Sequence, residues 1–179
     1  PLDAVEPTGW ASTEGGFNSN HAELRCGDDG RGGAGGYVLM PGLTFDLSSI
    51  PAGATIGSAE LRVYQERIDG DSVFTPLMRE VVVEHVRYTN MWEADEVTPV
   101  SGTIDRRRVS DLAGAGWRVT PVTEAVLRER QAGRTTVQLR LTIAPQSYDG
   151  DTAIDWVVFS SNNSTVVGQR PQLMLWYAP

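Results

Sequence analysis

The sequence contains no lysine, one cysteine and two histidines among its 179 residues. All 15 basic residues are therefore arginines, and with 23 acidic residues the formal net charge is −8. This charge disfavours nucleic acid as the main partner, because neutralising phosphates requires a basic surface. A single cysteine also excludes an internal disulfide framework, and Cys26 is expected to be a small buried core residue.

Long hydrophobic runs are missing as well. No run approaches the roughly 20 apolar residues that a helix needs to cross a bilayer, so no membrane insertion is expected. Residues 1–10 lack the basic start and apolar stretch of a signal peptide. We expect Pro1 to follow removal of an initiator methionine or cleavage of a leader.

Recognisable catalytic motifs are also lacking. Neither His21 nor His85 has the spacing of zinc ligands, and the sequence contains no nucleophile elbow and no phosphate-binding glycine fingerprint. Because an activity has to be argued from a site, we predict that the chain is not an enzyme and has no cofactor.

What the sequence does contain is a repeated alternation of apolar and polar residues. It is clearest at residues 59–64 and 136–143, and valine-rich or apolar stretches follow at 79–88, 153–160 and 172–177. Turns rich in Gly, Pro, Asn and Asp separate these stretches. The pattern predicts an all-β fold, a jelly-roll-like antiparallel β-sandwich in one domain over residues 1–179.

One short helix is predicted between two of the strands. Thr120 is expected to cap it, Pro121 to occupy its first position and Gly133 to end it. Residues 97–115, which precede this helix, are predicted to form an exposed loop.

Residues 43–56 read LTFDLSSIPAGATI and are followed by SAELRVY at 58–64. This stretch resembles the signature of the DNRLRE domain family, which includes modules classed as alginate-type carbohydrate-binding modules. The resemblance extends, more weakly, over nearly the whole chain. It implies a non-catalytic β-sandwich of the kind found on secreted or surface proteins beside polysaccharide-active enzymes.

Aromatic and arginine side chains are the candidates for ligand binding. Leu173, Leu175 and Tyr177 should share the inward face of the last strand, which leaves Trp176 outward on an exposed patch. Trp117 and Trp156 fall within strand patterns and are expected in the core. Sugars stack on aromatic rings, and arginine forks match carboxylates such as those of uronic sugars. The candidate ligand-binding residues are Trp176, Tyr148, Tyr64, Arg106, Arg107 and Arg108.

Asp149 and Asp151 flank Gly150 in a turn and could offer oxygen ligands to a calcium ion. The rest of an EF-hand loop is missing, so a plain turn is favoured, with calcium as the alternative.

Two functions remain open at this point. The first is a module that binds polysaccharide, including uronic-acid-containing chains. The second is a structural subunit of an exterior assembly such as a filament, surface layer or virion decoration, whose partners are neighbouring protein subunits. Both place the chain outside the cell, at a cell surface or on a particle exterior.

Overall fold

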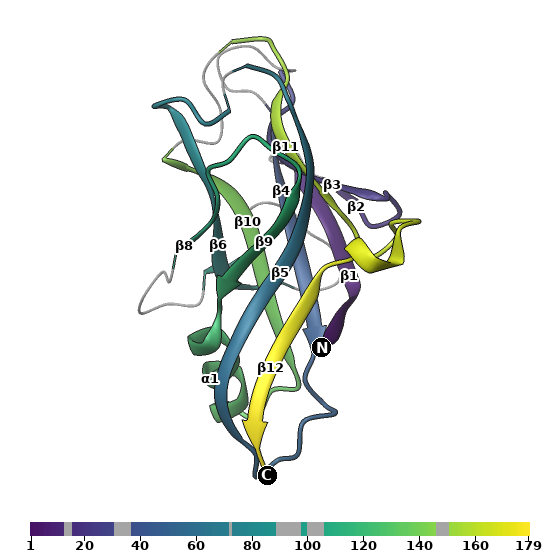
Figure 1. Ribbon diagram of the computed structural model, residues 1–179, viewed down its shortest axis with the longest axis vertical. Coiled ribbons are helices and arrows are strands. Elements are labelled where there is room, and N and C mark those ends of the chain that lie inside the picture. Colours follow the sequence, from purple (N-terminus) through teal and green to yellow (C-terminus); the bar gives the residue numbers. More distant parts are fainter. Residues whose placement is uncertain (13–15, 31–36, 72, 89–97, 100–105, 146–150) are drawn as a thin grey trace.

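The computed structural model of the protein describes residues 1–12, 16–30, 37–71, 73–88, 98–99, 106–145 and 151–179. Its elements are β1 (Leu2–Ser12), β2 (Phe17–Asn18), β3 (Glu23–Asp28), β4 (Val38–Asp46), β5 (Thr55–Asp69), β6 (Met78–Arg87), β7 (Thr98–Pro99), β8 (Arg107–Ser110), β9 (Gly116–Pro121), α1 (Thr123–Gln131), β10 (Thr136–Pro145), β11 (Asp155–Ser160), η1 (Val167–Gln169) and β12 (Gln172–Ala178). Antiparallel strands dominate, and α1 is the one α-helix of the described ranges (Figure 1). The predicted all-β sandwich with one short helix is confirmed.

The strands form two layers that face each other across the core. In the first layer, β5 pairs with β9 along one edge. Along its other edge it pairs with β12 over its first part and with β11 over its second. The second layer contains β1, β4, β10, β6 and β8, each paired with the next. Two strands connect the layers, because β3 pairs with β11 and β4 while β1 pairs with β12 and β4.

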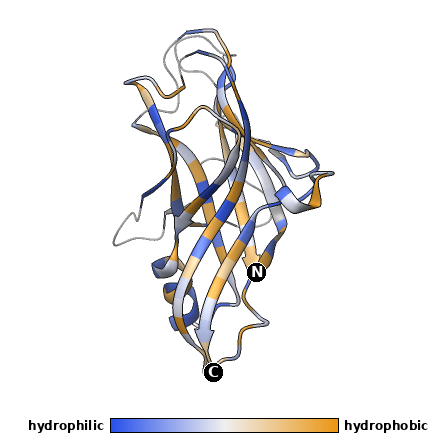
Figure 2. Cartoon of the chain, in the orientation of Figure 1, coloured by the Kyte–Doolittle hydropathy of each residue, from blue (hydrophilic) through white to orange (hydrophobic). Residues whose placement is uncertain are grey.

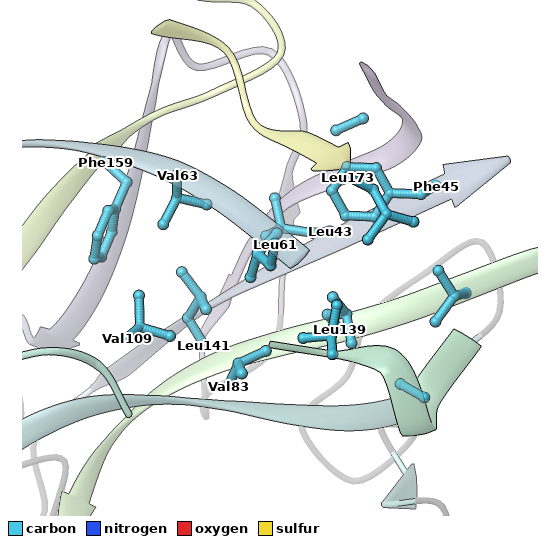
Figure 3. Close-up of a cluster of buried hydrophobic side chains, with 14 of the residues drawn as sticks. Leu43, Phe45, Leu61, Val63, Val83, Val109, Leu139, Leu141, Phe159 and Leu173 are labelled. Atoms are coloured by element: carbon cyan, nitrogen blue, oxygen red, sulfur yellow. The ribbon is translucent and has the colours of Figure 1, made fainter. Parts of the chain in front are cut away.

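The core fills the space between these layers and follows the predicted alternation (Figure 3). Successive side chains of a strand point to opposite faces, so every second residue is buried from Ala59 to Gln65 in β5 and from Val137 to Ile143 in β10. Figure 2 shows the corresponding alternation of hydrophobic and hydrophilic residues along β5. The fully or almost fully buried residues of the two layers include Leu43, Phe45, Leu61, Val63, Val83, Leu139, Leu141, Phe159 and Leu173. Cys26 is also completely buried, as predicted.

The helix begins later than predicted. Pro121 is the last residue of β9 and pairs with Glu60, while Val122 occupies the cap position of α1. Thr120 does not cap the helix, because it points inward from β9 and is 1% exposed. Pairing of β9 with β5 therefore overrides the local preference of proline for a first helical turn.

The stretch predicted as an exposed loop is also partly a strand. Residues Arg107–Ser110 form β8 and pair with β6. Val109 is 6% exposed and belongs to the core. The prediction was wrong here because β8 is only four residues long and its formation depends on an edge supplied by a distant strand.

Helix α1 is fastened to β6 through a buried carboxylate, Glu129. His85 Nε2 lies 2.8 Å from Glu129 Oε1, and Arg87 Nη2 lies 3.2 Å from the same oxygen. Arg134 also donates to this carboxylate. Burial alone would raise the pKa of Glu129, but the hydrogen bonds from Arg134 and Arg87 lower it overall. Burial lowers the pKa of His85, so both groups favour their deprotonated forms in the folded protein.

Candidate docking face

The outer side of the first layer carries an exposed group of aromatic and apolar side chains. We call it the aromatic face and define it as Tyr64 of β5, Trp117 and Val119 of β9, and Met174 and Trp176 of β12. Alternation places these residues on the side of the sheet opposite Leu61, Val63 and Leu173. Trp176 is 49% exposed and Val119 is 47% exposed, so the face is open to solvent in the described structure.

Contacts between neighbouring strands hold the aromatic rings in place. Tyr64 and Trp117 are paired in register, and their rings meet edge to face with centroids 5.6 Å apart. The guanidinium of Arg62 lies over the Trp117 ring, 5.3 Å from its centroid. Edge-to-face rings and cation–π contacts fix the orientation of side chains that remain half-exposed. The part of the face formed by Tyr64 and Trp117 is therefore ordered before any partner arrives.

A surface groove of about 380 Å³ lies beside Tyr64. Its walls include Glu66 of β5, Ala115 before β9, and Val166 in the loop that leads to β12. Val166 and its neighbour Val167 are 51% and 64% exposed. The aromatic face thus continues into a shallow depression of mixed polar and apolar lining, a shape that suits the side chains of a protein partner better than a flat sheet would.

The adjoining part of the same layer has a different chemistry. We call it the ion-paired face and define it as Glu23 and Arg25 of β3, Arg67 and Asp69 of β5, and Trp156 of β11. Arg67 lies 2.8 Å from Glu23 and 3.0 Å from Asp69. Arg25 packs over the ring of Trp156, whose Nε1 donates to Asp69 at 2.9 Å. The carboxylates and the Trp156 N–H of this face thus find partners within the chain, while the buried Nε of Arg25 has none among the described residues.

Two predicted ligand-binding residues, Trp176 and Tyr64, do lie on one face. Trp176 points outward as expected, and Leu173 is completely buried. Tyr177 was predicted inward but is 45% exposed, because the register between β12 and β5 shifts between Trp176 and Tyr177.

The arginine triplet does not form a single fork. Arg106 Nε donates to Glu84 at 2.6 Å, and Arg108 Nη1 donates to Asp111 at 2.7 Å. Arg107 lines a separate cavity of about 190 Å³ beside α1, together with His85. Neighbouring residues of a strand point to opposite faces, so β8 turns Arg107 away from Arg108. Arg106 precedes the strand and binds a different carboxylate from Arg108.

The predicted calcium turn lies largely beyond the parts of the chain that the structure describes. Tyr148 and Asp149 fall outside them. Asp151 is described, and its Oδ1 accepts a hydrogen bond from the backbone of Ala153 at 2.6 Å, the geometry of a turn. Calcium at this turn stays a prediction.

Reasoning from the sequence missed two residues of the aromatic face, Trp117 and Val119. Trp117 was assigned to the core, whereas it is half-exposed on the outer side of β9. Thr120 is the inward residue that fixes the alternation of this strand. If Thr120 points inward, alternation along the strand places Val119 and Trp117 on the outer side of the sheet.

Within the described ranges, no three His, Cys, Asp or Glu side chains are grouped so that they could hold a metal ion. No helix of those ranges is sufficiently long and apolar to span a membrane.

Fold and surface together define a β-sandwich with an ordered, exposed aromatic sheet face. The profile of the TGF-beta propeptide family matches residues 20–173, and the chain belongs to this family. It is a non-enzymatic family of secreted propeptides, in agreement with an extracellular location. Among curated proteins, none matches the sequence.

The family match corrects the resemblance to the DNRLRE domain. The residues that carry the resemblance form the end of β4, a turn and the start of β5, with Phe45, Leu47 and Leu61 completely buried. Such a pattern encodes a strand, a turn and a strand over a hydrophobic core, which unrelated sandwiches share. The predicted polysaccharide ligand and the alternative of an exterior structural subunit were likewise wrong, since the match is to a growth-factor propeptide.

Proposed function

We propose that this chain is a non-catalytic, extracellular propeptide domain that binds a growth factor of the TGF-beta class through its aromatic face. The observation that carries the proposal is the family match over residues 20–173. The aromatic face supplies the surface, and the domain works by holding a protein partner, with no chemical step.

The composition of the aromatic face supports a protein partner. Tryptophan, tyrosine, methionine and arginine are the residues enriched at the centres of protein interfaces. This face presents Tyr64 and Trp117 beside Arg62, and Met174 and Trp176 further along the same layer, opposite Glu60 and Ser58. The rings of Tyr64 and Trp117 lose little conformational freedom on binding, because their contact with each other and with Arg62 already orients them. Exposed apolar area of this kind is stabilised when a partner covers it.

Strand β12 offers a second means of attachment. It pairs with β5 along its whole length, whereas β1 pairs only with its first two residues, Gln172 and Leu173. In the described part of the chain, the edge from Met174 to Ala178 therefore has no other ladder partner. An extended segment of a partner can add to such an edge through backbone hydrogen bonds.

The test is to mix the full chain with a mature TGF-beta growth factor dimer and measure the mass of the species by light scattering after gel filtration. We expect a complex whose mass is the sum of its components. A chain that elutes separately from the growth factor at concentrations of about 10 μM, where interfaces of standard size are occupied, would overturn the proposal.

A matched pair of valine variants locates the interface. Val119→Asp replaces an apolar side chain of the aromatic face by a carboxylate beside Arg62, its partner across β5 and β9. It should weaken binding by about tenfold or more, because the growth factor would have to cover a hydrated charge pair in place of an apolar group. Val5→Asp is the control, since Val5 is 37% exposed on β1 and lies outside both the aromatic face and the groove beside it. Equal losses from both variants would place the growth factor elsewhere on the surface.

A further inference from the structure

A second groove opens at the end of the sandwich where α1 finishes. It has a volume of about 610 Å³ and lies between the last turns of α1, the loop before β5 and the start of β10. It shares no residue with the aromatic face. Its volume falls in the range of pockets that hold small organic molecules.

The floor of this groove is apolar. Ile56 of β5 is 9% exposed and belongs to the core, and Ala54 and Leu127 pack against the same core. The groove therefore reaches the edge of the hydrophobic interior. An apolar body placed there would be removed from water on the side that faces these three residues.

The rim of the groove carries positive charge. Arg130 lines it, and its Nη2 donates to the carbonyl oxygen of Pro51 at 2.6 Å, which holds the guanidinium in position. Among the described residues, no carboxylate pairs with Arg130. Arg134 also lines the groove, but it forms an ion pair with Glu129. The same carboxylate also forms an ion pair with Arg87.

This local excess of positive charge runs against the charge of the whole chain, which is −8. A guanidinium group offers several N–H donors in a planar fork, and a carboxylate is the group that matches this fork. One fixed, unneutralised arginine above an apolar floor thus combines the two requirements of a ligand with a charged head and an apolar body.

We propose that this groove binds a small organic carboxylate with an apolar body, of which a medium-chain fatty acid anion is the simplest example. The carboxylate pairs with Arg130, and the hydrocarbon lies on Ala54, Ile56 and Leu127. The proposal is independent of growth-factor binding, because it uses a different surface and a different class of ligand.

The first experiment compares probes on the full chain by isothermal titration calorimetry. Octanoate should bind at one site, 1-octanol should bind about tenfold more weakly because it lacks the charge, and acetate should not bind because it lacks the apolar body. Equal affinity for octanoate and octanol would overturn the proposal. So would exclusive binding of an acidic, leucine-rich peptide added as a fourth probe.

Two arginine variants on the same helix distinguish a specific ion pair between the carboxylate and Arg130 from a general attraction to positive charge. Arg130→Gln should weaken octanoate by about tenfold while leaving octanol unchanged. Arg128→Gln removes the same charge two residues away, from a side chain that does not line the groove, and should leave octanoate binding intact. Equal losses in the two variants would overturn the assignment of Arg130.

A third variant tests the location without touching any charge. Ala52 is exposed and lines the groove, so Ala52→Trp should fill the groove and abolish binding of both octanoate and octanol with the fold retained. Undiminished octanoate binding in this variant would place the ligand at another site.

Discussion

The aromatic face and the ion-paired face lie on the same outer side of one sheet layer and share the long strand β5. They differ in that the side chains of the ion-paired face contact one another within the chain, whereas those of the aromatic face remain partly exposed to solvent. On the ion-paired face, Arg67 meets both Glu23 and Asp69, and Trp156 is 7% exposed beneath Arg25. On the aromatic face, Trp176 is 49% exposed with no such cover.

The difference indicates which part of the layer stabilises the chain itself and which part is available to a partner. A charge that is already paired, or a ring that is already buried, gains little from a further contact. A ring that is half in water gains from being covered. Burial on the ion-paired face therefore contributes to folding, whereas the aromatic face retains apolar area for binding.

The largest expected contrast between the two faces comes from a pair of glycines. Gly27 of β3 has φ +138°, and a Cβ added to it would lie 2.3 Å from the carbonyl oxygen of Asp155. Gly57 of β5 lies beside the aromatic face, and its nearest contact for an added Cβ is the Trp176 carbonyl oxygen at 3.4 Å.

Gly27→Ala should therefore cost roughly 3 kcal/mol or more through strain and overlap. Gly57→Ala should change stability by less than about 1 kcal/mol. Urea unfolding measures both. Similar costs would show that backbone packing does not differ between the two parts of the layer.

The second contrast is between the tryptophans of the two faces. Trp156→Ala should cost about 3 kcal/mol of stability, because it removes a buried ring and leaves Asp69 without its Nε1 donor. Trp176→Ala should cost less than about 1 kcal/mol, since half of its ring is already in water. Thermal unfolding of the two variants is the measurement. A large loss from Trp176→Ala would mean that the aromatic face is part of the folding core.

The smallest contrast is in sensitivity to acid. Hydrogen bonding to Arg67 lowers the pKa of Glu23, and Asp69 has a lowered pKa because bonds from Trp156 and Arg67 outweigh its burial. A carboxyl group with a lowered pKa stabilises the fold when the pH is above its ordinary pKa, which is 4.5 for Glu23 and 3.8 for Asp69. This contribution is lost as the pH falls through the pKa that the group has in the folded protein.

Glu23→Gln should therefore flatten the fall in stability below about pH 4.5, by less than about 1 kcal/mol because the pair is partly solvated. Glu60→Gln is the matched control on β5, beside the aromatic face, where Glu60 forms no ion pair among the described residues. Urea midpoints from pH 7 to pH 3 test the pair. A control that flattens the profile equally would remove the distinction between the faces.

Alternation along single strands allowed the inward residues of β5 and β10 and the outward position of Trp176 to be predicted from sequence. The predictions failed where a residue's environment depends on a distant strand. Arg106, Arg107 and Arg108 separate because β8 pairs with β6, and α1 starts at Thr123 because β9 pairs with β5 through Pro121. The groove at the end of α1 brings together Ile56 and Arg130, which no local pattern connects.

Strand β1 pairs through Leu2 with Leu173 of β12 and through Ala4 with Phe45 of β4. On the ribosome, Leu173 is added about 170 residues after Leu2, so the two layers cannot be fully closed until β12 has been synthesised. Contacts of such sequence separation also slow folding, because a long loop must be ordered before they form. Until then, the core residues that β12 covers stay exposed, and the time before closure is the period in which this chain is most open to aggregation and to chaperones.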